Sequence, residues 1–135
     1  MNKFRYLFLI TILLAACADK KAQKKAVLDS VLSIHEKVMG TDGEVNDNKM
    51  KLDTLIKQQN LPATDSAWQI RGKLIAADSA MSTWMHNFDY EQKGKSDDAT
   101  ITYMRAQKTI IARIDSMINA ADNDSKIYLA TKNKK

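Results

Sequence analysis

The stretch ATDSAWQIRGKLIAADSAMSTWMHNFDY, residues 63–90, decides the fold class. Its apolar residues are separated alternately by three and four positions: Ala67, Ile70, Leu74, Ala77, Met81, Trp84 and Phe88. This spacing places them on one face of an α-helix, as in coiled coils and helical bundles. Pro62 ends the preceding element, and Thr64 or Asp65 can cap the new helix. The stretch therefore predicts a helix over residues 64–90.

The same spacing recurs toward the C-terminus and predicts a second helix of this kind over residues 97–122. Its apolar positions are Ile101, Met104, Ile111, Ile114, Ile118 and Ala121, with Gln107 or Lys108 as one polar step. Ser96 or Asp97 can cap it, and acidic residues in the first turn suit the helix dipole. The pattern fades after Asp122, although Ile127, Tyr128 and Leu129 could add two turns. Residues 123–135 are predicted to be a basic tail.

The N-terminal part of the chain predicts a long helix over residues 22–59. One apolar stripe precedes the segment MGTDGEV (39–45) and another follows it in the same register. Gly40 is a plausible residue just beyond a helix end, and Thr41 with Glu44 makes a capping box. We therefore expect this first helix to be kinked or broken near residues 40–43.

Together these patterns predict an all-α fold, an antiparallel three-helix bundle over residues 26–122. It can equally be described as a helical hairpin with a third helix. The chain has four glycines and one proline, and it has no run of apolar residues with period two. Short loops bring His35 opposite Phe88, Met39 opposite Trp84, and Met104 near Thr83.

The segment LITILLAACADKK (9–21) holds the single cysteine. A short basic start, an apolar run and small residues before Cys17 are typical of a secretory signal over residues 1–16. The run is far shorter than the roughly 20 residues that span a bilayer. Leu-Ala-Ala-Cys, residues 14–17, resembles the lipobox of bacterial lipoproteins. The resemblance implies cleavage before Cys17 and acylation of that residue, and the alternative is a core cysteine beside an ordinary cleavage site.

Acylation would hold the mature chain on a membrane lipid through Cys17, and it would leave no thiol for a disulfide. Residues 17–25 are then a lipidated basic tether, whose lysines gain energy at an anionic surface or simply stay solvated. Ala18, rather than aspartate, after the cysteine favours the outer membrane by resemblance to lipoprotein sorting rules. We expect a bacterial envelope protein that faces the periplasm. Neither basic stretch is interleaved with aromatic residues, so nucleic acid is not expected as a partner.

One cluster of side chains is a candidate site. The predicted registers bring His35, Met39, Met81, Met85 and Met104 into one layer, with His86 at its side. Methionine in such a layer can simply fill irregular space beside aromatic rings. Alternatively, thioethers and imidazole suit Cu(I) or a haem iron, and His35 and Met39 share one helical face. His86 lies off the stripe of Met81 and Met85, and no Cys-x-x-Cys-His motif is present for covalent haem.

No arrangement of residues suggests catalysis, and we do not expect an enzyme. The chain lacks a Gly-x-Ser-x-Gly motif, a phosphate-binding loop and a His-Glu-x-x-His motif. Its acidic residues are scattered over predicted solvent-facing positions, and no pair is placed for acid–base work.

IHEKVM (34–39), followed by MSTWMHNF (81–88) behind a lipobox, resembles a group of small helical lipoproteins of Bacteroidota. These proteins carry the label "viral A-type inclusion protein". The resemblance covers the signal and the first two helices. Gly40 stands where that family's pattern has a proline, which fits a kink. The resemblance implies anchoring and architecture, but no activity.

Three functions stay open at this point. The first is a non-enzymatic interaction or structural module with an envelope protein as partner, with self-association also open. The second is a copper or haem carrier that uses His35, Met39, Met81, Met85 and His86. The third is a chaperone-like binder of apolar segments.

Overall fold

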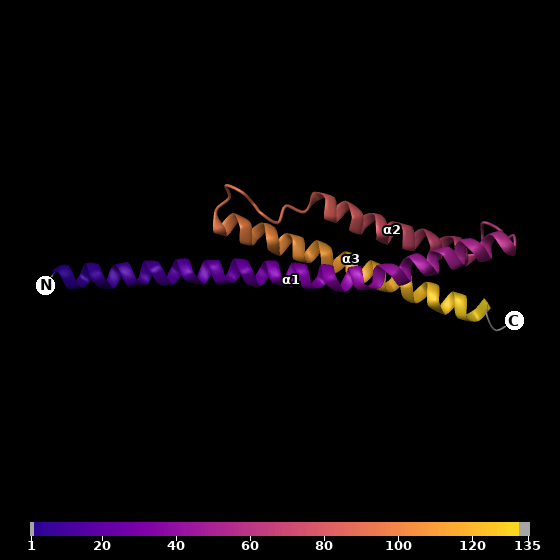
Figure 1. Ribbon diagram of the computed structural model, residues 1–135, viewed down its shortest axis with the longest axis horizontal. Helices are drawn as coiled ribbons and strands as arrows, with labels where there is room; N and C mark the ends of the chain where they lie inside the picture. The colour runs from indigo at the N-terminus through magenta and orange to yellow at the C-terminus, as the bar shows by residue number, and fades with distance from the viewer. Residues whose placement is uncertain (1, 133–135) are drawn as a thin grey trace.

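The computed structural model describes the backbone of residues 2–132 and the side chains of residues 19–132. Over this range the chain forms three helices, α1 (Asn2–Gln58), α2 (Ser66–Asn87) and α3 (Asp97–Lys132). Figure 1 shows an elongated bundle in which α2 runs back along α1, and α3 then runs in the same direction as α1. The prediction of an all-α three-helix bundle is confirmed.

The core follows a strict seven-residue repeat on α1. Val31, Val38, Val45 and Leu52 are each seven residues apart and at most 3 % exposed. On α3 the same repeat runs through Met104, Ile111, Ile118 and Ser125, all of which are buried. A repeat of seven residues keeps one seam facing the neighbouring helix only if the helices coil around each other. This explains why the helices in Figure 1 cross at a shallow angle rather than lying parallel.

Of the two alternatives predicted for residues 40–43, a kink or a break, the break is wrong, because α1 is one continuous helix through Gly40 and Gly43. Its axis does bend in Figure 1, where the ribbon passes from purple to magenta. Two glycines inside a helix cost about 1 kcal/mol each relative to alanine. Burial of Val38 and Val45 on the two sides gains about 1.5–3 kcal/mol each, and it requires that both keep the same helical register. Core burial therefore outweighs the local stop signals.

The predicted end of the third helix at residue 122 is also wrong, because α3 continues to Lys132. The extra turns are packed rather than free. Ser125 is fully buried, and Tyr128 and Leu129 pack against the core. The apolar pattern looks weak here because the heptad position after Ile118 is a serine. The hydroxyl of Ser125 donates to the backbone carbonyl of Asp122 at 2.6 Å, which satisfies it inside the core.

Ion pairs between α1 and α3 show that the two helices lie side by side in a parallel register. Lys20 contacts Asp98 at 2.7 Å and Lys37 contacts Asp115 at 2.7 Å, and each pair is separated by 78 residues in sequence. Lys24 contacts Asp97 at 2.6 Å. The stretch predicted as a lipidated basic tether, residues 17–25, is part of α1. Within it, the side chains of Lys20 and Lys24 contact acidic residues in the first turn of α3.

Candidate functional site

The structure separates the predicted His/Met layer into buried and exposed parts. Met81 and Met104 are only 4 % and 1 % exposed and belong to the interior, whereas Met39 and Met85 are 39 % and 41 % exposed. His35 is half-buried, and His86 is exposed. Among residues 19–132, no group of three or more His, Cys, Asp or Glu side chains is placed to hold a metal ion.

His35 contacts a neighbour one turn away from the predicted one. Its ring lies against Trp84, with 5.9 Å between ring centroids, rather than against Phe88. Trp84 stacks on Phe88 at 4.7 Å, and Phe88 on Tyr103 at 6.3 Å. These four rings join α1, α2 and α3 near the α2–α3 loop. Aromatic contacts of this kind contribute about 0.5–1.5 kcal/mol each beyond their buried area.

The polar step in the α3 seam has a defined partner. The indole Nε1–H of Trp84 donates to Oε1 of Gln107 at 2.8 Å. Trp84 is only 6 % exposed, so without Gln107 this donor would lack a partner. The pairing of Trp84 with Gln107 shows the α2–α3 register. In this register Met104 lies about one turn closer to the loop than the predicted position near Thr83.

The side of α2 and α3 that faces away from α1 forms an apolar groove of about 560 Å³, which we call the α2–α3 groove. Small residues of α2, Ala76, Ala80 and Thr83, make one wall. Ile110, Ile114 and Met117 of α3 make the other. Ile110 is 45 % exposed and Met117 is 39 % exposed, although both are large and apolar.

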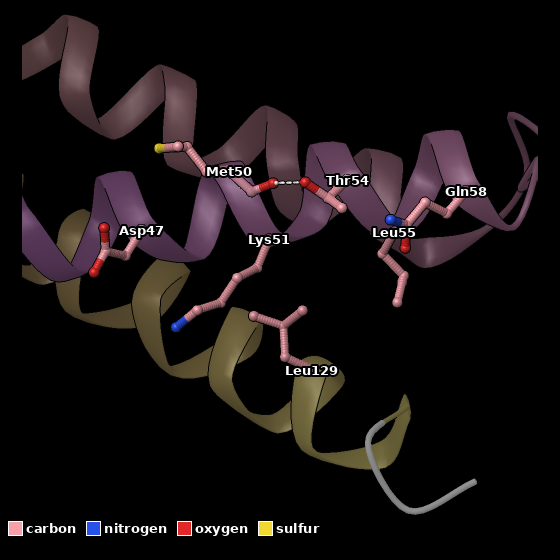
Figure 2. A pocket seen from close by; sticks show the side chains of 7 residues that line it. All are labelled: Asp47, Met50, Lys51, Thr54, Leu55, Gln58 and Leu129. Atoms are coloured by element: carbon pink, nitrogen blue, oxygen red, sulfur yellow. Dashed lines mark hydrogen bonds between the residues drawn. The ribbon is translucent and has the colours of Figure 1, made fainter.

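A second groove, of about 490 Å³, lies between the ends of α1 and α3 and is lined more evenly by polar and apolar groups. Figure 2 shows Lys51 and Leu55 of α1 pointing toward Leu129 of α3, while Met50 points to the other side of its helix. Met50 is 64 % exposed. This groove lies at the end of the bundle that is far from the N-terminus in Figure 1.

A buried polar network links α1 to α3. Asn48 and Asp122 are 4 % and 5 % exposed, and the Asn48 amide donates to Oδ1 of Asp122 at 2.9 Å. Lys126 contacts Oδ2 of Asp122 at 2.7 Å and Glu44 at 2.9 Å. The hydrogen bonds first of Asp122 and then of Glu44 raise the pKa of Lys126. The network joins α1 to α3 and gives each oxygen of the Asp122 carboxylate a partner.

The start of α2 and the end of α3 meet at Asp65. As the N-cap of α2, Asp65 accepts from the Ala67 amide at 2.9 Å, and it also accepts from the Tyr128 hydroxyl at 2.7 Å. These two hydrogen bonds, the backbone one first, lower the pKa of Asp65. Burial, and next the bond to Asp65, raise the pKa of Tyr128 to about 12.

A further charged contact joins α1 to α2. Arg71 donates to Asp53, which also contacts Lys49 at 3.2 Å. Burial by itself would raise the pKa of Asp53, but the hydrogen bonds from Arg71 and Lys49 outweigh it and lower that pKa. Asp53 and Arg71 lie within one residue of the predicted α1–α2 register, whereas His35 and Trp84 lie about one turn from it. The Asp53–Arg71 ion pair joins the second half of α1 to the first turns of α2.

Cys17, the predicted acylation site, lies outside the residues whose side chains are described. In the part of the chain that the structure describes, no helix combines the length and apolar character needed to cross a membrane. Sequence reasoning missed the α2–α3 groove, because Ile110 and Met117 lie off the a/d seam. The signal was available as apolar positions at a spacing of three and four on the outer face of α3. Comparison with models of known families, with curated proteins and with solved structures finds no match.

Proposed function

We propose that this chain is a lipid-anchored helical protein of the bacterial cell envelope that serves as a non-enzymatic interaction or structural module. The lipobox-like segment at residues 14–17 supports the anchor. Ala18 supports the outer membrane, with the bundle in the periplasm. The exposed apolar side chains of Ile110 and Met117 in the α2–α3 groove support a role in binding, because exposed apolar side chains grouped around a groove are a common feature of interaction sites.

One observation carries this proposal furthest. The pairs Lys20–Asp98 and Lys24–Asp97 close the base of the bundle within about two helical turns of Cys17. An acyl anchor at Cys17 would therefore hold a rigid rod close to the lipid surface, rather than a domain on a flexible linker. Such a rod presents its long sides to partners in the periplasm.

Metabolic labelling tests the anchor. Cells that express the protein are fed labelled palmitate and fractionated into inner membrane, outer membrane and soluble material. The wild type is expected to carry label in the outer membrane, and Cys17→Ser is expected to lose the label. Ala18→Ser serves as the matched control that keeps the cysteine. Label that persists in Cys17→Ser, or a wild type without label, contradicts the proposal.

A second candidate is a soft-metal carrier, and the exposure of two thioethers favours it. Met39 lies one turn beyond His35 on the same helix, and Met85 follows directly after Trp84, whose ring contacts His35. Titration with Cu(I), followed by Trp84 fluorescence in a Trp68→Phe background, should give saturable quenching. His35→Ala is expected to abolish the quenching, and Met81→Leu in the core is expected to leave it intact. Unsaturable quenching contradicts this candidate, and a parallel haem titration covers the iron alternative.

A further inference from the structure

We propose that the α2–α3 groove is the docking site for an acidic amphipathic helix of a partner protein, which would pack there as a fourth helix of the bundle. This inference builds on the proposed role as an interaction module, but it does not depend on the lipid anchor.

The two walls of the groove match the way helices pack. Ala76, Ala80 and Thr83 lie at intervals of four and three on α2, and Ile110, Ile114 and Met117 have the same intervals on α3. Side chains at this spacing form the ridges and holes that receive a neighbouring helix. The wall on α2 is low because its residues are small, so the backbone of an incoming helix can approach closely. From Ala76 to Asn87 the groove is about 17 Å long, or three helical turns.

Charge selects the occupant. Arg113 is the one charged residue in the lining of this groove, and within residues 19–132 it forms no ion pair. It lies between the exposed side chains of Ile110 and Met117, near the middle of the α3 wall. A helix that covers the groove would bury the guanidinium, which must then meet a carboxylate, because an unpaired buried charge is strongly unfavourable.

The position of Arg113 argues against a second copy of this chain. In an antiparallel twofold pairing of this face with itself, the centre of the α3 wall would meet its own copy. Arg113 would then face Arg113 of the second molecule, and juxtaposed like charges cost several kcal/mol, on the order found at mismatched interfaces. A partner helix that carries glutamate or aspartate beside its apolar stripe has no such penalty.

The experiment uses two designed peptide helices. Both carry leucine at alternating intervals of three and four; one has glutamate beside the stripe, and the other has lysine at the same positions. The protein is the chain from Ala18 onward, which keeps every buried residue described, from Val31 to Ser125. Its helical content is verified by circular dichroism. Trp84 lines the groove, so its fluorescence in a Trp68→Phe background reports occupancy.

The glutamate peptide is expected to bind about tenfold or more tightly than the lysine peptide, a difference that one desolvated charge contact can supply. Arg113→Glu should reverse this preference. The pair Ile110→Ser and Met117→Ser should abolish binding. Ile127→Ser, at a 58 % exposed apolar position elsewhere on α3, should leave it unchanged.

Several results would overturn the inference. They are failure of the glutamate peptide to bind, equal binding of the two peptides, or an equal loss in the Ile127→Ser control. Analytical ultracentrifugation provides a further check. A dimer of the protein that Ile110→Ser dissociates would make a second copy the occupant, against this proposal. Failure of palmitate labelling would remove the anchor but would leave each of these binding results in place.

Discussion

At the scale of single residues, the Trp84–Gln107 pair shows how a polar residue can belong in an apolar seam. Gln107 occupies a seam position where leucine would bury more apolar surface. Its carbonyl oxygen accepts the buried indole N–H at 2.8 Å. Leaving such a donor without a partner costs about 1–3 kcal/mol, more than one extra buried methylene gains. The glutamine is thus the more stable choice while Trp84 is present.

We therefore expect Gln107→Leu to lower the free energy of unfolding by about 1–2 kcal/mol. The double variant Trp84→Phe, Gln107→Leu should lose less free energy of unfolding than the two single variants together, because it contains no buried indole N–H without a partner. Urea unfolding of the wild type, the two single variants and the double variant measures this coupling. Strict additivity of the two single changes in the double variant would contradict a stabilising role for the hydrogen bond.

Tyr128 gives the molecule a pH dependence on the alkaline side. Burial and the bond to Asp65 raise its pKa to about 12, against about 10 in the unfolded chain. Because the pKa is raised in the folded state, the neutral Tyr128 hydroxyl stabilises the fold fully below about pH 10. This stabilisation is lost as the pH rises toward 12. Tyr128→Phe should be less stable at pH 7 and should show a shallower decline between pH 10 and 12. Guanidinium unfolding of both proteins across this range measures the difference, and parallel curves would contradict it.

At the scale of elements, α1 continues through Gly40 and Gly43, two residues that in the sequence alone indicate the end of a helix. A β-carbon added at Gly40 or Gly43 would meet nothing within 4 Å. Gly40→Ala and Gly43→Ala should therefore each raise the free energy of unfolding by about 0.5–1 kcal/mol, because alanine favours a helix interior. The matched control is Gly94→Ala in the α2–α3 loop. Gly94 has a φ of +74°, so alanine there should destabilise by about 1 kcal/mol. Thermal unfolding followed by circular dichroism compares the three variants, and a loss for Gly40→Ala comparable to that for Gly94→Ala would mean that α1 breaks in solution.

The elements also show what could be predicted from the sequence. The seam of α2 and its Asp65 cap were predictable because local spacing and capping chemistry act within a few residues. The start of α3 at Asp97 was predictable for the same reason. The C-terminal end of α3 was not predictable, because the burial of Asp122 and Ser125 depends on tertiary contacts with other helices. One of these contacts is the hydrogen bond from Asn48 to Asp122. Buried polar residues look like surface residues in a single sequence.

For the candidate sites too, local spacing was predictable from the sequence and contacts between helices were not. The sequence placed His35 and Met39 correctly on one helical face. The predicted layer does not form, because Met39 and Met85 each directly follow a buried seam residue, Val38 and Trp84, and are exposed. Met81 and Met104 occupy the seams themselves and are buried. The α2–α3 register also differs by about one turn from the predicted one, as the hydrogen bond between Trp84 and Gln107 shows, and loop lengths alone do not predict such a tertiary contact. The α2–α3 groove is similarly a property of two helices together.

At the scale of the whole molecule, the two loops lie at opposite ends of the rod. The α2–α3 loop lies toward the N-terminal end, and the α1–α2 loop lies at the far end (Figure 1). Lys24 meets Asp97 near the base, and α1 ends at Gln58. At 1.5 Å per residue, about 50 Å of helix separates these two levels. An anchor at Cys17 would therefore bring the α2–α3 loop to the lipid surface and hold the α1–α2 loop away from it.

Lipidated protein in vesicles that contain a headgroup-attached quencher tests this orientation. A fluorophore on Lys95→Cys, in the α2–α3 loop, should be strongly quenched. The same fluorophore on Gln59→Cys, just beyond α1, should be nearly unaffected, because quenching by contact or short-range transfer does not extend over the length of the bundle. Each labelled variant is compared with its Cys17→Ser counterpart, which should remain unquenched in solution. Equal quenching at both sites would mean that the rod lies flat on the membrane, with one long side covered by lipid, and the α2–α3 groove would then have to compete with that surface for its partner.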